Sequence, residues 1–227
     1  MPQYENCHLV ILSKYPESGN VKSRLAKSIG EEAAAKIMEA LLVDLYSVHV
    51  NQNYGLSICA PISDKRFENN FLKLLPGALI EYVESTDLRG PHSQLYKIFK
   101  NKLKVHRKVV AITSDTPGID EELVISTFNK LENVDVVIGP DSGTGYYLVG
   151  LKKEIDIFTD FPPKREPYLE KTLDLINKEK ATYELIRSLP DLDFVTDISK
   201  INWNKVKWGW KRTIKVIRAL GLWGRPN

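Results

Sequence analysis

Three cationic side chains and one glycine follow the first apolar run of the sequence. They are Lys14, Gly19, Lys22 and Arg24, and a helical segment comes after them. Gly19 permits a close approach of the backbone to a ligand, while the cations can neutralise phosphate oxygens, Arg24 through two parallel hydrogen bonds. The segment lacks the second glycine of a Walker A loop. It is either a cradle for an anion or a solvated basic turn that leads into a helix.

A carboxylate, Asp115, stands directly after the fourth apolar run, between Ser114 and Thr116. One interpretation is an Asx turn, in which the aspartate oxygen accepts hydrogen bonds from backbone amides. An unpaired carboxylate here would repel phosphates held by the first loop, whereas a divalent cation could bridge Asp115 and phosphate oxygens. We favour the metal interpretation, because ligands of open sheets bind where such loops meet, at the carboxyl ends of the strands.

Acidic residues recur near the C-terminal end, at Asp191, Asp193 and Asp197. In an extended segment Asp191 and Asp193 would face one way, which suits a second metal ligand. In the other interpretation Asp197 or Thr196 caps a short helix and the remaining acids are solvated. The loop at residues 139–147, which contains Asp141, would either approach a substrate or form a turn between strands.

Short apolar runs are the elements that must position these loops. They recur at residues 7–12, 54–60, 78–83, 108–113 and 134–138, and further strands are expected at 146–151 and near 183–188. Apolar spacing predicts helices at residues 31–50, 65–75, 93–104, 121–131 and 168–180. This alternation predicts an α/β fold with a mostly parallel sheet flanked by helices. The scattered histidines show no catalytic or metal-binding spacing.

The composition is typical of a globular protein: 43% of the 227 residues are hydrophobic, and no linker or repeat divides them. Cys7 and Cys59 have no nearby cysteine or histidine partner, which argues against a disulfide framework or a zinc site. The start of the sequence lacks a basic region, and its apolar run is too short for a signal peptide. We therefore expect a cytoplasmic protein.

Charge is uneven along the chain. The net value is +3, but residues 204–227 hold seven Lys or Arg and no acid, which leaves 25 basic and 29 acidic side chains in residues 1–203. A mildly acidic body argues against nucleic-acid binding. We expect one domain at residues 1–203 and a basic, tryptophan-rich C-terminal helix at residues 204–227.

That C-terminal segment has two interpretations. A helix over residues 206–220 would place Val206, Trp210 and Ile217 on one face, and Lys211 and Lys215 on another. The helix either packs its apolar face on the domain or lies on anionic lipid, a boundary that basic, tryptophan-rich helices favour. In the second case the protein is associated with the inner surface of the membrane, and its acceptor is lipid-linked.

Together these segments resemble a known family, the glycosyltransferase-A-like proteins called radical-SAM and selenium-domain-associated transferases, which are relatives of the phospholactate guanylyltransferases and the molybdenum-cofactor nucleotidyltransferases. The likeness covers most of residues 7–198. The family motif Lys-x-Pro-x-x-Gly-x-Val-Lys-Thr-Arg-Leu is matched at Lys14, Pro16, Gly19, Val21, Lys22, Arg24 and Leu25, with Ser23 in place of Thr. Ser-Asp-x-Pro-Gly is matched at Ser114, Asp115, Pro117 and Gly118, and the late acidic motif at Asp191, Asp193 and Asp197.

The resemblance implies a nucleotide-diphospho-sugar transferase fold and Mg²⁺ or Mn²⁺ held by Asp115 and Asp193. The donor would be a nucleoside triphosphate or a nucleotide-sugar, and the acceptor a small or lipid-linked molecule. Nucleotide contacts then fall to Lys14, Gly19, Lys22, Arg24 and Ser114, and catalytic roles to Asp115, Lys22 and Asp141. Transfer of a sugar or of a nucleotidyl group would use the same cradle.

Two departures from the family pattern bear on activity. Gly143-Thr144-Gly145 stands where the family has Asp-Gly-Gly, so an acid is missing and Asp141 is its nearest substitute. Residues 86–94 keep neither the spacing nor the arginine of the family's Gly-Asp-Leu-Gly-x-Arg segment. The alternative function is therefore a degenerate, non-catalytic domain that binds a nucleotide or a partner.

Overall fold

One seven-stranded sheet organises the computed structural model, which describes residues 4–84, 91–158, 167–206 and 208–223. The strand order is β3-β2-β1-β4-β6-β5-β7. Neighbours are parallel except around β6, which runs antiparallel to both β4 and β5. The strands are β1 Cys7–Leu12, β2 Gly55–Pro61, β3 Ile80–Val83, β4 Lys108–Thr113, β5 Val136–Pro140, β6 Tyr146–Leu151 and β7 Tyr183–Leu185.

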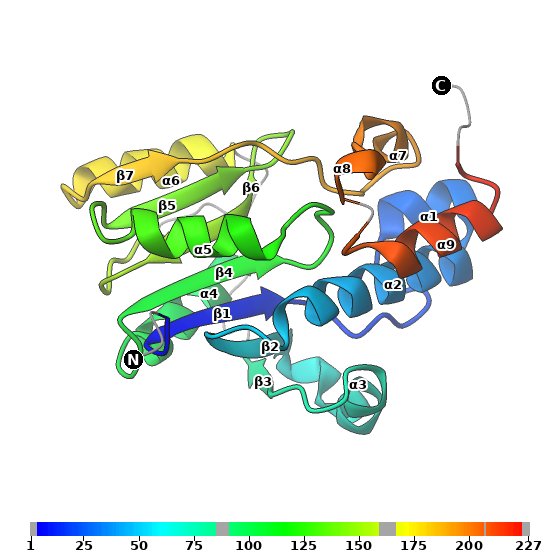
Figure 1. Ribbon diagram of the computed structural model, residues 1–227, viewed down its shortest axis with the longest axis horizontal. Helices are drawn as coiled ribbons and strands as arrows, with labels where there is room; N and C mark the ends of the chain where they lie inside the picture. Colours follow the sequence, from blue (N-terminus) through cyan, green and yellow to red (C-terminus); the bar gives the residue numbers. More distant parts are fainter. Residues whose placement is uncertain (1–3, 85–90, 159–166, 207, 224–227) are drawn as a thin grey trace.

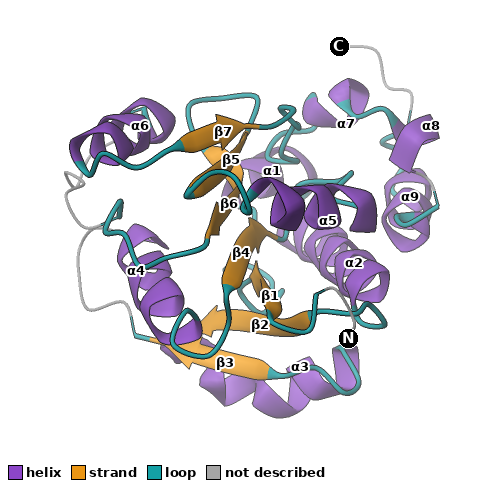
Figure 2. Ribbon diagram, turned by 60° about the vertical axis from the view of Figure 1, so that its left-hand side comes forward, coloured by secondary structure: helices purple, strands orange, loops and turns teal. Residues whose placement is uncertain are grey.

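Helices cover both faces of the sheet, as Figure 2 shows, with α4 and α6 on one face and α2 and α5 on the other. The α-helices are α1 Ser23–Ile29, α2 Glu31–His49, α3 Glu68–Leu74, α4 Pro91–Lys102, α5 Glu121–Lys130, α6 Tyr168–Lys178, α7 Asp197–Lys200, α8 Trp203–Val206 and α9 Lys211–Ala219. The expected α/β fold with a mostly parallel sheet flanked by helices is confirmed. No helix in the described ranges is long and apolar enough to span a membrane.

Side chains alternate between two hydrophobic cores along each central strand. In β1, Leu9 and Ile11 enter the core beneath α2 and α5, whereas Val10 enters the core beneath α4 and α6. In β4, Val110 enters the core beneath α2 and α5, and Val109 enters the core beneath α4 and α6. A strand that is buried on both faces needs a continuous apolar run, which is why such runs marked the strands in the sequence.

Two helical segments differ in kind from the sequence-based expectation, and the bounds of several other elements are shifted by up to three residues. The helix expected at residues 65–75 is preceded by a 3₁₀ helix, η1 Ile62–Phe67, and becomes α-helical only at Glu68. The helix expected at residues 206–220 begins only at Lys211, as α9. Val206 is the last residue of a separate short helix, α8, and Gly209 lies between the two. A Cβ atom at Gly209 would lie 2.8 Å from Val48 Cγ2, so the chain approaches α2 too closely there for a side chain.

Two histidines are buried beside hydroxyl groups. His8 Nε2 lies 2.9 Å from Ser57 Oγ, and His49 Nδ1 lies 2.7 Å from Tyr54 Oη. The residues are 4% and 0% exposed. Burial lowers the pKa of His8 to about 3 and that of His49 to about 4, so both rings stay neutral in the folded protein at neutral pH.

We expect these histidines to destabilise the fold as the pH falls from 7 to 5. The unfolded chain takes up a proton at each histidine near pH 6.5, while the folded chain does so only near its lowered pKa, so acid favours unfolding by about 2 kcal/mol per histidine at pH 5. The measurement compares the free energy of urea-induced unfolding of wild type and His49→Gln at both pH values. Every other group titrates in both proteins, so a difference that does not change with pH would contradict the buried neutral state.

Candidate active site

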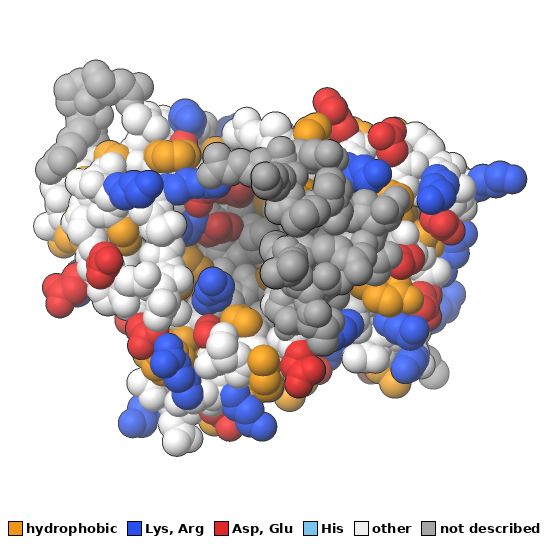
Figure 3. Space-filling view, turned by 180° about the vertical axis from the view of Figure 1, so that it is seen from behind, with side chains coloured by type: hydrophobic (Ala, Val, Ile, Leu, Met, Phe, Trp, Pro, Cys, Tyr) orange, Lys and Arg blue, Asp and Glu red, His pale blue; other side chains and the backbone are white. Residues whose placement is uncertain are grey.

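A cavity of about 740 Å³ opens at the carboxyl ends of β1 and β4. Seen from behind in Figure 3, the molecule is hollowed, and acidic side chains lie inside the hollow between basic ones. The cavity lining brings together six of the predicted site residues, namely Lys14, Lys22, Arg24, Ser114, Asp115 and Asp193. Residues from three distant parts of the chain therefore meet where the parallel strands end, as an open sheet requires of its ligand site.

Lys22 forms a bridge between two carboxylates in this cavity. Its Nζ atom lies 2.7 Å from Asp115 Oδ2 and 2.9 Å from Asp193 Oδ1, and the Lys22 side chain is only 5% exposed. Arg24 Nη1 adds a contact of 2.7 Å to the other oxygen of Asp193. Burial works to lower the pKa of Lys22, but the two carboxylates outweigh it and hold this pKa above its ordinary value. The ammonium group therefore remains charged.

The backbone at Lys22 is held in an unusual conformation. Its φ of 48° and ψ of 44° lie in the left-handed region, directly before the first residue of α1. A residue with a side chain adopts this region at a cost, and such residues gather at functional sites. The conformation turns the chain from the cationic loop into α1, where it places Lys22 and Arg24 on the same pair of acids.

Asp115 has one oxygen bound to Lys22 and one oxygen without a well-aligned donor among the described residues. Oδ2 binds Lys22, whereas Oδ1 is buried and makes no hydrogen bond of ordinary geometry to any described residue. Burial works to raise the pKa of Asp115, but the charge and hydrogen bond of Lys22 prevail and hold it below its usual value. A buried carboxylate oxygen without a donor is costly, and it is the type of atom that a cation would satisfy.

Asp191 lies in a different environment from Asp193. It accepts a hydrogen bond from the buried hydroxyl of Thr116, and burial together with the charge of Asp115 raises its pKa to about 7. Asp193, in contrast, binds both cations. The sequence interpretation that grouped the two aspartates did not anticipate Thr116, although this threonine directly follows Asp115 in the chain.

The carboxylates of this cavity are too few to hold a structural metal by themselves. They fit a cation that binds together with substrate phosphates. No three acidic, histidine or cysteine side chains form a complete cage in the part of the chain that the structure describes. Mg²⁺ commonly takes one or two protein carboxylates and completes its shell with water and phosphate oxygens. Asp115 and Asp193 supply such a pair, and the Lys22 ammonium now stands between them.

Two predicted site residues, Gly19 and Asp141, lie outside this lining. Gly19 has a φ of 83° and faces the Glu31 carboxylate, outside the cavity lining. Asp141 lines an adjoining cavity of about 190 Å³, and its Oδ1 accepts hydrogen bonds from the amides of Gly143 and Gly145 at 2.7 and 3.1 Å. Asp141 thus shapes its own loop. Of the departure noted at residues 86–94, residues 86–90 fall outside the described residues, and Gln94 lines the large cavity.

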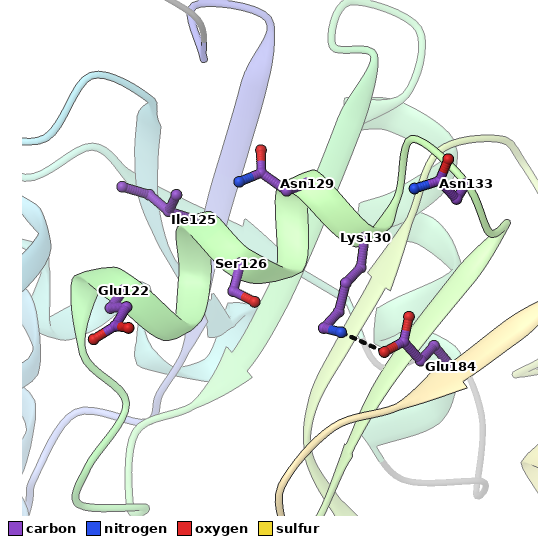
Figure 4. Close-up of a pocket in the computed structure, with 7 residues that line it drawn as sticks. All are labelled: Glu122, Ile125, Ser126, Asn129, Lys130, Asn133 and Glu184. Carbon is purple, nitrogen blue, oxygen red and sulfur yellow. Dashed lines mark hydrogen bonds and ion pairs between the residues drawn. The ribbon is translucent and has the colours of Figure 1, made fainter.

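Another hollow of about 460 Å³ lies between α5 and the β7 residue Glu184, and its lining residues appear in Figure 4. Glu184 forms an ion pair with Lys130 across it. Neither the cationic loop nor Asp115 contributes to its lining. Lys14, Lys22, Arg24 and Asp115 instead line the cavity at the strand ends.

Solved structures share the fold of this chain. A protein from Desulfovibrio desulfuricans G20, provisionally named a nucleotide-diphospho-sugar transferase, is similar with a TM-score of 0.80, 23% identity, and coverage of 95% of this chain and 96% of that one. CMP:2-keto-3-deoxy-manno-octonic acid synthetase complexed with CTP is similar with a TM-score of 0.54, 11% identity, and coverage of 86% and 96%. A cytidylyltransferase from Leptospira borgpetersenii serovar Hardjo-bovis gives 0.52, 15%, and 99% of each chain.

Sequence comparison matches a shorter part of the chain than the structural comparison does. Residues 85–163 match the model of a family described as uncharacterized protein conserved in bacteria (DUF2064). No curated protein matches the chain. The matched segment includes β4, Asp115 and Asp141, but neither Lys22 nor Asp193, so the ionic bridge extends beyond it.

Substitution of Lys22 tests the bridge. We expect Lys22→Met to lower the free energy of unfolding by roughly 3 kcal/mol without divalent ions, because two carboxylates lose their shared cation. Chemical unfolding in EDTA measures the loss, and Mg²⁺ is expected to recover part of it. The control is Lys14→Met, which removes an exposed lysine of the same cavity and should cost about 0.5 kcal/mol or less. Equal losses in the two variants would contradict a structural role for the bridge.

Proposed function

We propose that this protein is a metal-dependent transferase that takes a group from a nucleotide donor, either a nucleoside triphosphate or a nucleotide-sugar. The observation that carries the proposal is the meeting of Lys22 and Arg24 with Asp115 and Asp193 in one cavity at the strand ends. Cations beside paired carboxylates serve phosphate binding and metal binding at the same place. The fold shared with nucleotide-diphospho-sugar transferases supports the same class of donor.

Lys22 exchanges partners in the proposed mechanism. In the free protein its ammonium group offsets the charges of Asp115 and Asp193. When the donor binds, these carboxylates would hold Mg²⁺ or Mn²⁺, which supplies charge stabilisation for the leaving phosphates. Lys22, which enters this step as an ammonium group because the two carboxylates hold its pKa up in the free protein, then donates to phosphate oxygens, together with Arg24 and Lys14. Ser114, buried at the end of β4, lies in the same lining.

The two donor types lead to different bond changes. With a nucleoside triphosphate, an acceptor oxygen attacks the α-phosphorus in line, the bond to the bridging oxygen breaks, and pyrophosphate leaves. With a nucleotide-sugar, the acceptor attacks the sugar carbon, and a nucleoside diphosphate leaves. The similarity to a cytidylyltransferase and to a synthetase complexed with CTP favours the first reaction.

The smaller cavity is the proposed place for the acceptor. It shares Leu12 and Thr113 with the large cavity, and tyrosine side chains from β6 and α6 line it. Asp141 also lines it and would act as the base that receives the proton of an acceptor hydroxyl. One oxygen of Asp141 is engaged in its own loop, which leaves the other for this role.

One observation favours a non-catalytic alternative. Gly143 stands where the resembling family has an acid, and Asp141 uses hydrogen bonds to stabilise the loop around it. A domain of this kind would bind nucleotide through the same cations and leave it unchanged. Turnover distinguishes the two functions.

We expect the purified protein to consume a nucleotide when it is given Mg²⁺ or Mn²⁺, a pool of nucleoside triphosphates and nucleotide-sugars, and a mixed pool of acceptors. Release of pyrophosphate identifies nucleotidyl transfer, and release of a nucleoside diphosphate identifies glycosyl transfer. EDTA and Asp115→Asn should each abolish product formation, because both remove the proposed metal site. The matched control is Asp174→Asn at an exposed position of α6, which should retain activity.

Two results would decide against the proposal. Metal-dependent nucleotide binding without any turnover would establish the non-catalytic alternative. Turnover that is indifferent to EDTA and to Asp115→Asn would show that the metal role is wrong.

A further inference from the structure

The C-terminal helix α9 is held in one orientation by α2. Asp44 of α2 accepts hydrogen bonds from the backbone amides of Arg212 and Thr213, at 3.2 and 2.7 Å. These amides belong to the first turn of α9, where no hydrogen-bond partner exists within the helix. Trp210 and Ile217 are buried at the interface with the domain. One side of α9 therefore faces the core, and the side chains on its opposite side are exposed to solvent.

The opposite side carries three cations at helical spacing, with a tryptophan at each end. Lys211, Lys215 and Arg218 are exposed and lie on one face of α9, because residues four and three apart are neighbours on a helix. Lys211 Nζ lies 5.8 Å from the ring centre of Trp208, and Arg218 Cζ lies 4.6 Å from that of Trp223. We call Trp208, Lys211, Lys215, Arg218 and Trp223 the basic tryptophan face.

This face has two features that a stable core does not explain. Trp208 is 76% exposed, although large aromatic side chains are usually well buried, and Trp223, whose ring centre lies 5.8 Å from that of the buried Trp203, is still 38% exposed. None of Lys211, Lys215 and Arg218 forms an ion pair with an acid in the described part of the chain, whereas their neighbour Arg212 lies 3.8 Å from Glu39. Positive charge and aromatic surface are therefore both presented outward.

We propose that the basic tryptophan face is a peripheral docking surface for an anionic lipid membrane. Lysine and arginine are attracted to anionic headgroups, and tryptophan favours the boundary between headgroups and acyl chains. A nucleic acid is less suited, because three cations form a small patch on a body in which acids outnumber bases over residues 1–203. Because residues 1–203 are mildly acidic and residues 204–227 are basic, an anionic membrane attracts this face rather than the rest of the molecule.

The docking surface lies at the same end of the molecule as the cavity. Figure 1 shows α1, α7, α8 and α9 beyond the ends toward which the β1 and β4 arrows point. Asp197, at the start of α7, accepts hydrogen bonds from the amides of Asp193 and Phe194 at 3.0 and 2.7 Å. A Cβ atom at Gly118, in the loop after Asp115, would lie 3.1 Å from Val206 Cγ1 of α8. The segment that precedes the face is thus packed on the two parts of the candidate site that carry Asp115 and Asp193.

Co-sedimentation of the full chain with vesicles tests the proposal without reference to transferase activity. The probes are vesicles of phosphatidylcholine alone and vesicles that also contain phosphatidylserine. We expect binding only to the anionic vesicles, and loss of this binding as salt is added, because the attraction is electrostatic. Lys211→Glu/Lys215→Glu should weaken binding roughly tenfold or more, since two attractive charges become repulsive. Trp208→Ala should weaken it as well.

The control is Lys104→Glu/Lys178→Glu, which makes the same charge change at exposed positions outside the face. It should bind like wild type, and thermal unfolding of all variants verifies that they fold. The proposal is overturned if the protein ignores both vesicles, if it binds neutral vesicles equally, or if the control loses as much binding as the Lys211/Lys215 variant. Preferential binding to a DNA duplex over anionic vesicles would also overturn it and would assign the face to nucleic acid.

Discussion

The ionic bridge at Lys22 is the interaction on which the candidate site depends. It joins residues that are 93 and 171 positions apart in the chain, in the loop after β1, the loop after β4 and the segment after β7. Asp115 and Asp193 both contact the Lys22 ammonium group, and without a cation between them their carboxylates would repel each other. In the proposed function the same pair holds a divalent cation, so one pair of carboxylates binds Lys22 in the free protein and the metal in the complex with the donor.

The scaffold around the bridge places these three segments with backbone contacts. The amide of Leu192 donates to the carbonyl of Asp115 at 2.9 Å, which ties the acidic segment to the loop after β4. Asp197 holds the amide of Asp193 from the other side. The left-handed conformation of Lys22 then brings the third segment to the same place. Three separate constraints therefore fix the positions of two carboxylates and one ammonium group.

Much of the fold could be predicted from the sequence because its physical signals are local. The strands β1, β4 and β6 have the bounds that were expected, since each is a buried apolar run between polar turns. The break between α8 and α9 could not be predicted, because it depends on how closely Gly209 approaches Val48 on α2. The loops that meet in the cavity were identified from residue types, but Lys22 was assigned to nucleotide binding and catalysis and not to an ion pair with acids. Its pairing with Asp115 and Asp193 is a tertiary contact, as is the hydrogen bond between Asp191 and Thr116.

The most direct test of this account is a crystal structure of the full chain with Mn²⁺ and inorganic pyrophosphate. Pyrophosphate is a suitable probe because both proposed types of donor contain a diphosphate group. Anomalous scattering locates the manganese without reference to activity. The account predicts a manganese peak in contact with Asp115 and Asp193, with Lys22 Nζ moved from the carboxylates to a phosphate oxygen. Manganese bound elsewhere, or pyrophosphate bound while Lys22 keeps both carboxylates, would contradict it.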